Sequence, residues 1–244
     1  MKVAVLGGTK GMGRSLARLF AARGDAVCLL GRHQEDLDKS AEDLRSRGKA
    51  DVSVLLCDLE KPYEFSAVLD AAHYKLGGLD TVVLTAAMFA IQDALENDPA
   101  TVEKLLSVNF TNTILFCEEA RRRLLAEGGG TLCVFSSVAG ERGRKPVVIY
   151  GATKAGLSAY LEGLDHKFRA QGLRTVCVKP GFVKTGMTAG LKPPPFAGTP
   201  DAVARRVLRA IDAGKPVVYA PGIWALMMFV IRHLPRAVMR RVGF

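Results

Sequence analysis

The sequence predicts an α/β fold of the Rossmann type, a doubly wound parallel sheet of about seven strands with helices on both faces. Two observations predict it. Short, continuous apolar runs rich in Val, Leu and Cys recur along the 244 residues, which is typical of strands buried on both faces of a sheet. Longer segments with helical periodicity separate these runs and are long enough to connect parallel strands.

The expected elements follow one another in strict alternation. We expect strands at residues 3–6, 26–30, 52–57, 81–85, 131–135, 175–178 and, more weakly, 216–219. We expect helices at residues 12–23, 35–46, 63–76, 100–126, 149–171 and 201–213. No internal repeat and no Pro/Gly/Ser-rich linker interrupts this pattern, so we expect one domain over residues 1–244.

The composition argues against several classes of protein. The formal net charge is +10, but Lys and Arg are spread along the chain without a nucleic-acid-reading motif, so we expect no nucleic acid partner. An anionic membrane surface or anionic small molecules fit the charge equally well. The five cysteines form no C-x-x-C pair and the four histidines no pair at helical spacing, which predicts a reducing compartment and no metal site. The chain begins without the features of a signal peptide, so we expect a cytoplasmic location.

A glycine-rich loop follows the first expected strand, at the point where a helix begins. Such a loop lets the backbone turn tightly and approach a pyrophosphate, whose charge is met by free N–H groups at the helix N-terminus. A tight turn without a ligand is the alternative. We predict a dinucleotide site that includes Gly7, Thr9, Lys10, Gly11, Met12 and Gly13.

The spacing of Gly7, Gly11 and Gly13 resembles that of the short-chain dehydrogenase/reductase family, and the resemblance extends over nearly the whole chain. It implies an enzyme that transfers a hydride between a nicotinamide cofactor and a ketone or alcohol. The second strand ends at Arg32 with no acidic residue to bind the ribose hydroxyls of NAD, whereas an Arg can pair with the 2′-phosphate of NADP. Lys10 is a second cation near that phosphate in NADP-using members. We therefore expect NADP(H), although either cation could be a solvated surface charge.

Two further segments match cofactor positions of the family. Asp58 and Leu59 follow the third strand where an Asp meets the adenine, although an Asp at a strand end could equally cap the next helix. The family's N-N-A-G motif is here T-A-A-M at residues 85–88, which is a departure. The resemblance implies that Ala86 and Ala87 still approach the nicotinamide ribose.

Tyr150 and Lys154 lie four residues apart in a helical segment and share one face. A phenol with a pKa near 10 transfers protons near neutrality only if its phenolate is stabilised, and an ammonium group can do this. In the family, such a pair forms the catalytic set with a Ser thirteen residues before the Tyr, here Ser137, and with an Asn in the preceding helix, here Asn109. The alternative is that Ser137 caps a strand end and Tyr150 is an amphipathic core residue.

The resemblance assigns a role to each of these residues. Ser137 polarises the carbonyl oxygen, Tyr150 donates the proton, and Lys154 lowers the tyrosine pKa and binds the nicotinamide ribose. Asn109 kinks its helix and supports a water-mediated proton path to the lysine. A segment after the sixth strand matches the residues that hold the nicotinamide carboxamide. These residues are Pro180, Gly181, Val183 and Thr185.

The substrate is less well marked. Residues 149–188 and the basic, apolar tail are similar to bacterial reductases of the decaprenylphosphoryl-2-keto-ribose reductase type, which implies a polyprenyl-phosphate sugar or another lipid-like ketone or alcohol. Residues 184–200, with three consecutive prolines, form either a substrate lid or an ordinary surface connection. The rival hypothesis is a catalytically silent NADP-binding scaffold or redox sensor, which only the altered T-A-A-M segment supports. The family also implies a homodimer or homotetramer built on the long helices.

The tail at residues 222–244 carries an apolar stretch, residues 223–231, that has no polar face and is too short to span a bilayer. We interpret residues 222–241 as a peripheral hydrophobic element that its own domain, a partner subunit or lipid must cover. Trp224 at one end and a basic cluster at the other could place it at an anionic membrane surface. The cluster consists of Arg232, Arg236, Arg240 and Arg241.

Overall fold

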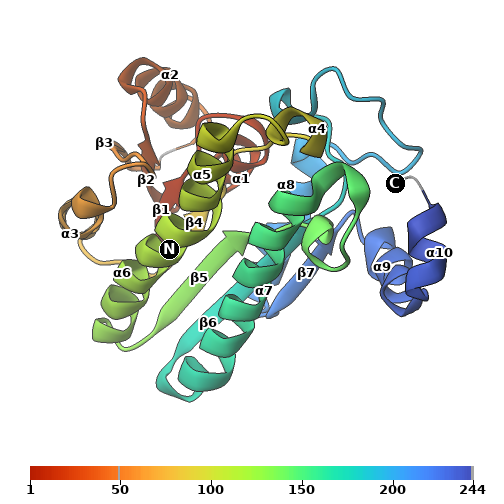
Figure 1. Ribbon diagram of the computed structural model, residues 1–244. Coiled ribbons are helices and arrows are strands. Elements are labelled where there is room, and N and C mark those ends of the chain that lie inside the picture. The colour runs from red at the N-terminus through yellow and green to blue at the C-terminus, as the bar shows by residue number, and fades with distance from the viewer. Residues whose placement is uncertain (49, 243–244) are drawn as a thin grey trace.

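The computed structural model describes residues 1–48 and 50–242. Its described residues form one sheet of seven parallel strands in the order β3-β2-β1-β4-β5-β6-β7, and Figure 1 shows helices on both sides of it. The doubly wound α/β fold is therefore confirmed. The strands are β1 (Lys2–Leu6), β2 (Ala26–Gly31), β3 (Val52–Leu56), β4 (Thr81–Leu84), β5 (Gly130–Phe135), β6 (Leu173–Pro180) and β7 (Val217–Ala220).

The helices vary widely in length. The α-helices are α1 (Gly11–Arg23), α2 (Gln34–Arg45), α3 (Phe65–Leu76), α4 (Gln92–Leu95), α5 (Pro99–Leu106), α6 (Asn112–Ala126), α7 (Val148–Phe168), α8 (Pro200–Asp212), α9 (Ile223–His233) and α10 (Arg236–Arg241). The short helical turns are η1 (Pro62–Glu64), the π-helical η2 (Ser107–Thr111), η3 (Val138–Gly140), η4 (Lys145–Val147), η5 (Arg169–Gln171) and η6 (Gly186–Thr188).

Each face of the sheet has its own apolar core, because alternate side chains of a strand point to opposite faces. On one face, Val3 and Val5 of β1 pack in a cluster that includes buried side chains of α1, α2 and α8. On the other face, Ala4 and Leu6 of the same strand belong to a cluster with α3, α6 and α7. A strand buried on both sides reads as a continuous apolar run, which is the pattern that the sequence shows.

The expected helix at residues 100–126 is interrupted. The structure divides it into α5, the π-helical turn η2 and α6. Within η2, the fully buried Asn109 donates to the Met88 carbonyl oxygen and accepts from the Met88 N–H. Single π turns inside helices are frequent at functional sites. The interruption thus aims an amide side chain at the loop after β4, a tertiary contact that periodicity does not reveal.

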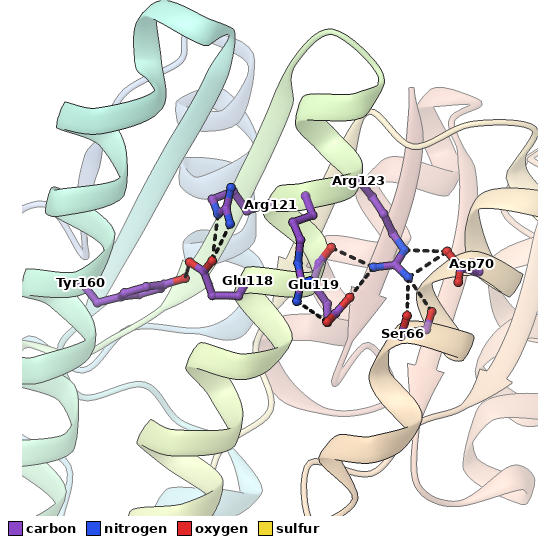
Figure 2. Close-up of polar contacts among 8 residues, drawn as sticks. Ser66, Asp70, Glu118, Glu119, Arg121, Arg123 and Tyr160 are labelled. Carbon is purple, nitrogen blue, oxygen red and sulfur yellow. Dashed lines mark hydrogen bonds and ion pairs between the residues drawn. The ribbon is translucent and has the colours of Figure 1, made fainter.

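Salt bridges and hydrogen bonds link α6 to both of its neighbours (Figure 2). Glu118 of α6 accepts from the Tyr160 hydroxyl of α7 at 2.7 Å and from the Arg121 guanidinium. Burial, together with Glu118, raises the pKa of Tyr160 strongly, so this phenol stays protonated as a donor. Arg123 of α6 reaches acceptors on α3 and on its own helix, namely Ser66, Asp70 and Glu119. These contacts tie α6 to α7 on one side and to α3 on the other.

The tail forms two helices beyond the β7 end of the sheet (Figure 1). One face of α9 packs on the protein, where Trp224 and Met228 form a small cluster with Val138. The other face exposes apolar side chains, which are Ile223, Leu226, Phe229 and Val230. The prediction that Trp224 anchors a membrane surface is wrong, because its side chain is buried in this cluster.

The composition-based expectations can be compared with the described residues. All five cysteines lie among them and are buried, free thiols. Within residues 1–48 and 50–242, no cluster of three His, Cys, Asp or Glu side chains has a geometry suited to a metal ion. None of the described helices combines the length and apolarity needed to cross a membrane.

Candidate active site

A cavity of 410 Å³ opens at the carboxyl ends of the strands around β1, which is where open α/β sheets bind ligands. It lies beside the glycine-rich loop and the ends of β2, β3 and β4. Many of the residues that the sequence predicts for the cofactor line it, namely Gly7, Thr9, Lys10, Gly11, Met12, Gly13, Arg32, Asp58, Leu59, Ala86, Ala87 and Thr185. Tyr150, Lys154, Pro180, Gly181 and Val183 are not part of this lining.

The glycine-rich loop has the backbone geometry of a phosphate cradle. Gly7 and Gly11 adopt φ angles of +90° and +53°, which favour glycine. At Gly13 a Cβ atom would lie 2.2 Å from the Gly7 carbonyl oxygen, so only glycine fits there. The N-terminus of α1 lies at this loop, with no acidic residue in its first turn and no capping bond from the Lys10 side chain among the described contacts. Its N–H groups and helix dipole therefore favour a bound anion.

Acidic residues outside the predicted site lie near both expected NADP-binding cations. Lys10 forms an ion pair of 2.8 Å with Asp36 in the first turn of α2, and Arg32 lies 3.8 Å from Glu60. The Lys10 ammonium holds the pKa of Asp36 below its usual range. Both pairs are solvent-exposed, and exposed ion pairs contribute little to stability. A ligand phosphate can therefore replace the carboxylates at small cost.

Two side chains compensate for the altered T-A-A-M segment. The Thr85 hydroxyl donates to the carbonyl oxygens of Leu6 and Gly7, which ties the end of β4 to the glycine-rich loop. Asn109 holds the Met88 backbone from the other side. These bonds hold residues 85–88 in place although the Asn and Gly of the family motif are absent. The Asp58 carboxylate accepts from the Glu60 N–H, so it caps the local turn and also lines the cavity.

Tyr150 and Ser137 lie together beyond the carboxyl end of β5. Tyr150 is buried near the start of α7, and Phe89 meets its ring edge-on at a centroid distance of 5.1 Å. Burial raises the pKa of Tyr150 to about 12, while the Ser137 hydroxyl and the Arg144 guanidinium act in the opposite direction. Ser137 also accepts from the Ala139 N–H as the cap of η3, so the strand-end cap expected as an alternative is present together with the contact to Tyr150.

Lys154 is 2 % exposed and lies one helical turn after Tyr150. Its ammonium donates to the Phe135 carbonyl oxygen at 2.9 Å and lies 5.8 Å from the centroid of the Tyr150 ring. Burial lowers the pKa of Lys154 to about 8. The structure thus places the Lys154 ammonium behind the Tyr150 ring. The groups that lower the pKa of the phenol are Ser137 and Arg144, rather than Lys154 as the resemblance implied.

The segment after β6 lies between the cofactor cavity and the tail. Gly181 follows β6, and a Cβ atom there would come within 2.0 Å of the Trp224 indole nitrogen. Val183 is buried and forms an isolated β-bridge with Gly198, which closes the base of the connection at residues 184–198. Thr185, together with Gly186 and Met187 of η6, lines the cavity.

Comparisons with known proteins agree with this geometry. The family model described as short chain dehydrogenase matches residues 1–195. The chain belongs to this family. It is 33% identical over 242 residues to an uncharacterized oxidoreductase of Mycobacterium tuberculosis (strain ATCC 25618 / H37Rv). This match covers 98% of this chain and 96% of the relative. It is 28% identical to carbonyl reductase family member 4 of Xenopus laevis over 86% of this chain and 90% of the relative.

Solved structures share the fold of this short-chain dehydrogenase. A short-chain type dehydrogenase/reductase from Mycobacterium ulcerans superposes with a TM-score of 0.82 at 22% identity, covering 89% of this chain and 86% of that one. A putative short-chain alcohol dehydrogenase from Sinorhizobium meliloti 1021 gives a TM-score of 0.81 at 24% identity, covering 90% and 94%. The family establishes an NAD(P)-dependent oxidoreductase that acts on C–OH or C=O groups.

Proposed function

We propose that this short-chain dehydrogenase uses NADP(H) to interconvert a ketone and an alcohol, with Tyr150 as the proton donor or acceptor. The observation that carries the proposal is the buried Tyr150 phenol, which has the Ser137 hydroxyl beside it and the Lys154 ammonium behind its ring. The glycine cradle at Gly7 and Gly13 fits a dinucleotide pyrophosphate. When bound, the nicotinamide supplies or accepts the hydride.

The side chains divide the proton chemistry between them. In the reductive direction, the Ser137 hydroxyl holds the substrate oxygen and the Tyr150 hydroxyl gives it a proton as negative charge develops there. Below its lowered pKa of about 8, Lys154 provides a positive charge from a buried position, where electrostatic effects are strong. Asn109 acts by holding the Met88 backbone in place and by supporting a water path to Lys154. In the oxidative direction each proton step is reversed.

The decisive experiment deletes only the phenol oxygen. Tyr150→Phe should abolish turnover of a ketone panel, followed by NADPH absorbance, and should leave NADPH binding largely intact. The rival, a catalytically silent scaffold or redox sensor, predicts that the unaltered protein turns over none of these ketones. Retained activity within a factor of a few in Tyr150→Phe would mean that another group is the acid.

The preference for NADP(H) over NAD(H) rests on Lys10 and Arg32 at the rim of the cavity. Charge-assisted hydrogen bonds of about 1.5–3 kcal/mol predict NADPH binding at least about tenfold tighter than NADH binding. Arg32→Ala should weaken NADPH and leave NADH nearly unchanged in a fluorescence titration. Equal affinities of the unaltered protein for the two cofactors would remove the basis for this preference.

The connection at residues 184–200 supports a more specific proposal for the class of substrate. Residues 184–200 carry the exposed apolar side chains Met187, Leu191 and Phe196, which suit a lid over a lipid-like ketone of the type reduced by decaprenylphosphoryl-2-keto-ribose reductases. Shortening residues 190–196 to a glycine linker should raise KM for a long-chain ketone more than for a short-chain one. An equal change for both would identify an ordinary surface connection.

The exposed face of α9 suits a peripheral contact between a cytoplasmic enzyme and an anionic membrane. Leu226, Phe229 and Val230 are more than half exposed, and arginines of α9 and α10 follow them. Phe229→Ser/Val230→Ser should abolish co-sedimentation with anionic liposomes at low salt while the solution mass stays constant. A change of mass would assign the face to a homodimer or homotetramer contact, in place of the contact through α6 and α7 that we expect.

A further inference from the structure

The segment between Ser137 and Tyr150 carries four charged residues, and three of them have structural partners. Glu141 is bonded to Lys179 of β6 and to Tyr219 of β7. Arg142 donates to the Leu234 carbonyl oxygen at 2.7 Å, and Lys145 donates to the Arg240 carbonyl oxygen at 2.7 Å. These contacts fasten the segment to the sheet and to the tail. The fourth residue is Arg144.

Among the described residues, Arg144 lacks the side-chain partners that its charged neighbours have. Its Nε atom is buried and has no hydrogen-bond partner anywhere in residues 1–48 and 50–242. No carboxylate in the same ranges forms a salt bridge with its guanidinium, although such pairs are common elsewhere on this chain. A buried guanidinium nitrogen without a partner is unfavourable, so a group outside the described chain is expected to satisfy it.

The guanidinium lies near the reacting group. Its charge acts on the Tyr150 phenol and lowers the pKa of that phenol, and burial lowers the pKa of Arg144 itself. Arg144 has an extended backbone (φ −134°, ψ 142°) and directly precedes η4, which leads into α7. Lys145 and Arg142 on either side are tied to the tail, so the position of Arg144 is set by its neighbours.

We propose that Arg144 binds an oxyanion of the substrate, a carboxylate or a phosphate, close to the carbon that exchanges the hydride. The inference rests on the proposed function, because Tyr150 fixes where the reacting oxygen lies. A guanidinium presents donors in a planar fork that matches these two anions and that a neutral ketone leaves unused. The substrate class is therefore an anionic ketone or alcohol, which also agrees with the net charge of +10.

The first test compares anionic ketones with neutral analogues. The pairs are phenylglyoxylate with its methyl ester, and dihydroxyacetone phosphate with dihydroxyacetone. At saturating NADPH, kcat/KM should be at least tenfold higher for the anion of one pair, and the responding pair tells carboxylate from phosphate. Arg144→Ala and Arg144→Gln should reduce this ratio to about one, whereas Arg209→Ala, which removes the same charge from the exposed face of α8, should keep it. A ratio near one in the unaltered enzyme, or an equal ratio in the Arg144 variants, would overturn the proposal.

The second test does not require turnover. Isothermal titration of the full chain with saturating NADPH should show that benzoate or methylphosphonate binds at least tenfold more tightly than neutral benzamide. Arg144→Gln should lose this difference and Arg209→Ala should retain it. If anions bind at Arg144 but no ketone is turned over, the proposed function fails and the anion site stands. If Tyr150→Phe abolishes turnover but neither anion binds better than benzamide, only the anion site is refuted.

Discussion

Glu141 lies at the junction of the catalytic segment, the sheet and the tail, so its charge can be tested by its effect on stability. Its side chain is 3% exposed, and its partner Lys179 is 14% exposed. Tyr219 donates to the same carboxylate at 2.9 Å, and Arg232 of α9 lies 3.4 Å from its second oxygen outside hydrogen-bond geometry. Glu141→Gln keeps the size and an acceptor oxygen but removes the negative charge.

The expected cost follows from the burial of the two partners. Removing one member of a fully buried ion pair costs about 3–5 kcal/mol, and an exposed pair contributes about 0–1 kcal/mol. Because Lys179 is nearly buried and the 45% exposed Arg232 adds little, we expect Glu141→Gln to lower the free energy of unfolding by about 2–3 kcal/mol. Urea unfolding with linear extrapolation measures this difference.

A matched control separates the buried charge from a general loss of acid. Glu35→Gln removes the same group from an exposed pair with Lys39, in which the side chains are 81% and 71% exposed, and should change stability by less than about 0.5 kcal/mol. If Glu141→Gln also stays within about 0.5 kcal/mol of the unaltered protein, the buried charge of Glu141 does not stabilise the fold.

Three further predictions concern packing, charge and pH. Gly181→Ala should destabilise the protein by about 1–3 kcal/mol because its Cβ would clash with Trp224, and adding Trp224→Leu should recover part of the loss in thermal unfolding. Asp36→Asn frees Lys10 and should tighten NADPH binding about two- to fivefold without affecting NADH, whereas an equal change for both cofactors would show that Lys10 does not meet the 2′-phosphate. Burial lowers the pKa of Lys154 to about 8 from 10.5, so between these pH values the unfolded chain binds more protons at this residue, and the contribution of Lys154 to stability rises by up to about 3 kcal/mol with pH. Lys154→Met should lack this gain in urea unfolding at pH 7.5 and 10, and an unchanged pH dependence would refute it.

Features encoded by local patterns were predicted well from the sequence. The strands of the central sheet are buried on both faces, so the apolar runs located them to within a few residues. The glycine-rich loop was equally clear, because positive φ angles at Gly7 and Gly11 and the tight contact at Gly13 leave no other residue type. The resemblance to the short-chain dehydrogenase/reductase family pointed to Ser137, Tyr150 and Lys154, and the structure places Ser137 and Lys154 beside Tyr150.

Features that depend on tertiary contacts could not be predicted in this way. The resemblance implied a kink in the helix at Asn109, but no local pattern revealed that its side chain bonds to the Met88 backbone twenty-one residues earlier. The burial of Trp224 depends on the small size of Gly181, which is remote in sequence. Arg144 belongs to no motif, and only its position beside Tyr150 and its lack of a partner in the described chain distinguish it from other arginines. In the sequence, Arg144 is marked only as one of four charged residues between Ser137 and Tyr150.

The five buried thiols make the folded protein nearly inert toward alkylating reagents. The thiolate is the reactive form, and burial raises the pKa of every one of these groups, to about 12 for Cys57. Alkylation therefore requires the structure around a thiol to open, and the rate of alkylation reports how often it does so. Because the thiols lie at different depths of the sheet and its helices, a mass spectrum taken over time would order the regions by how often they open. The thiols are Cys28, Cys57, Cys117, Cys133 and Cys177.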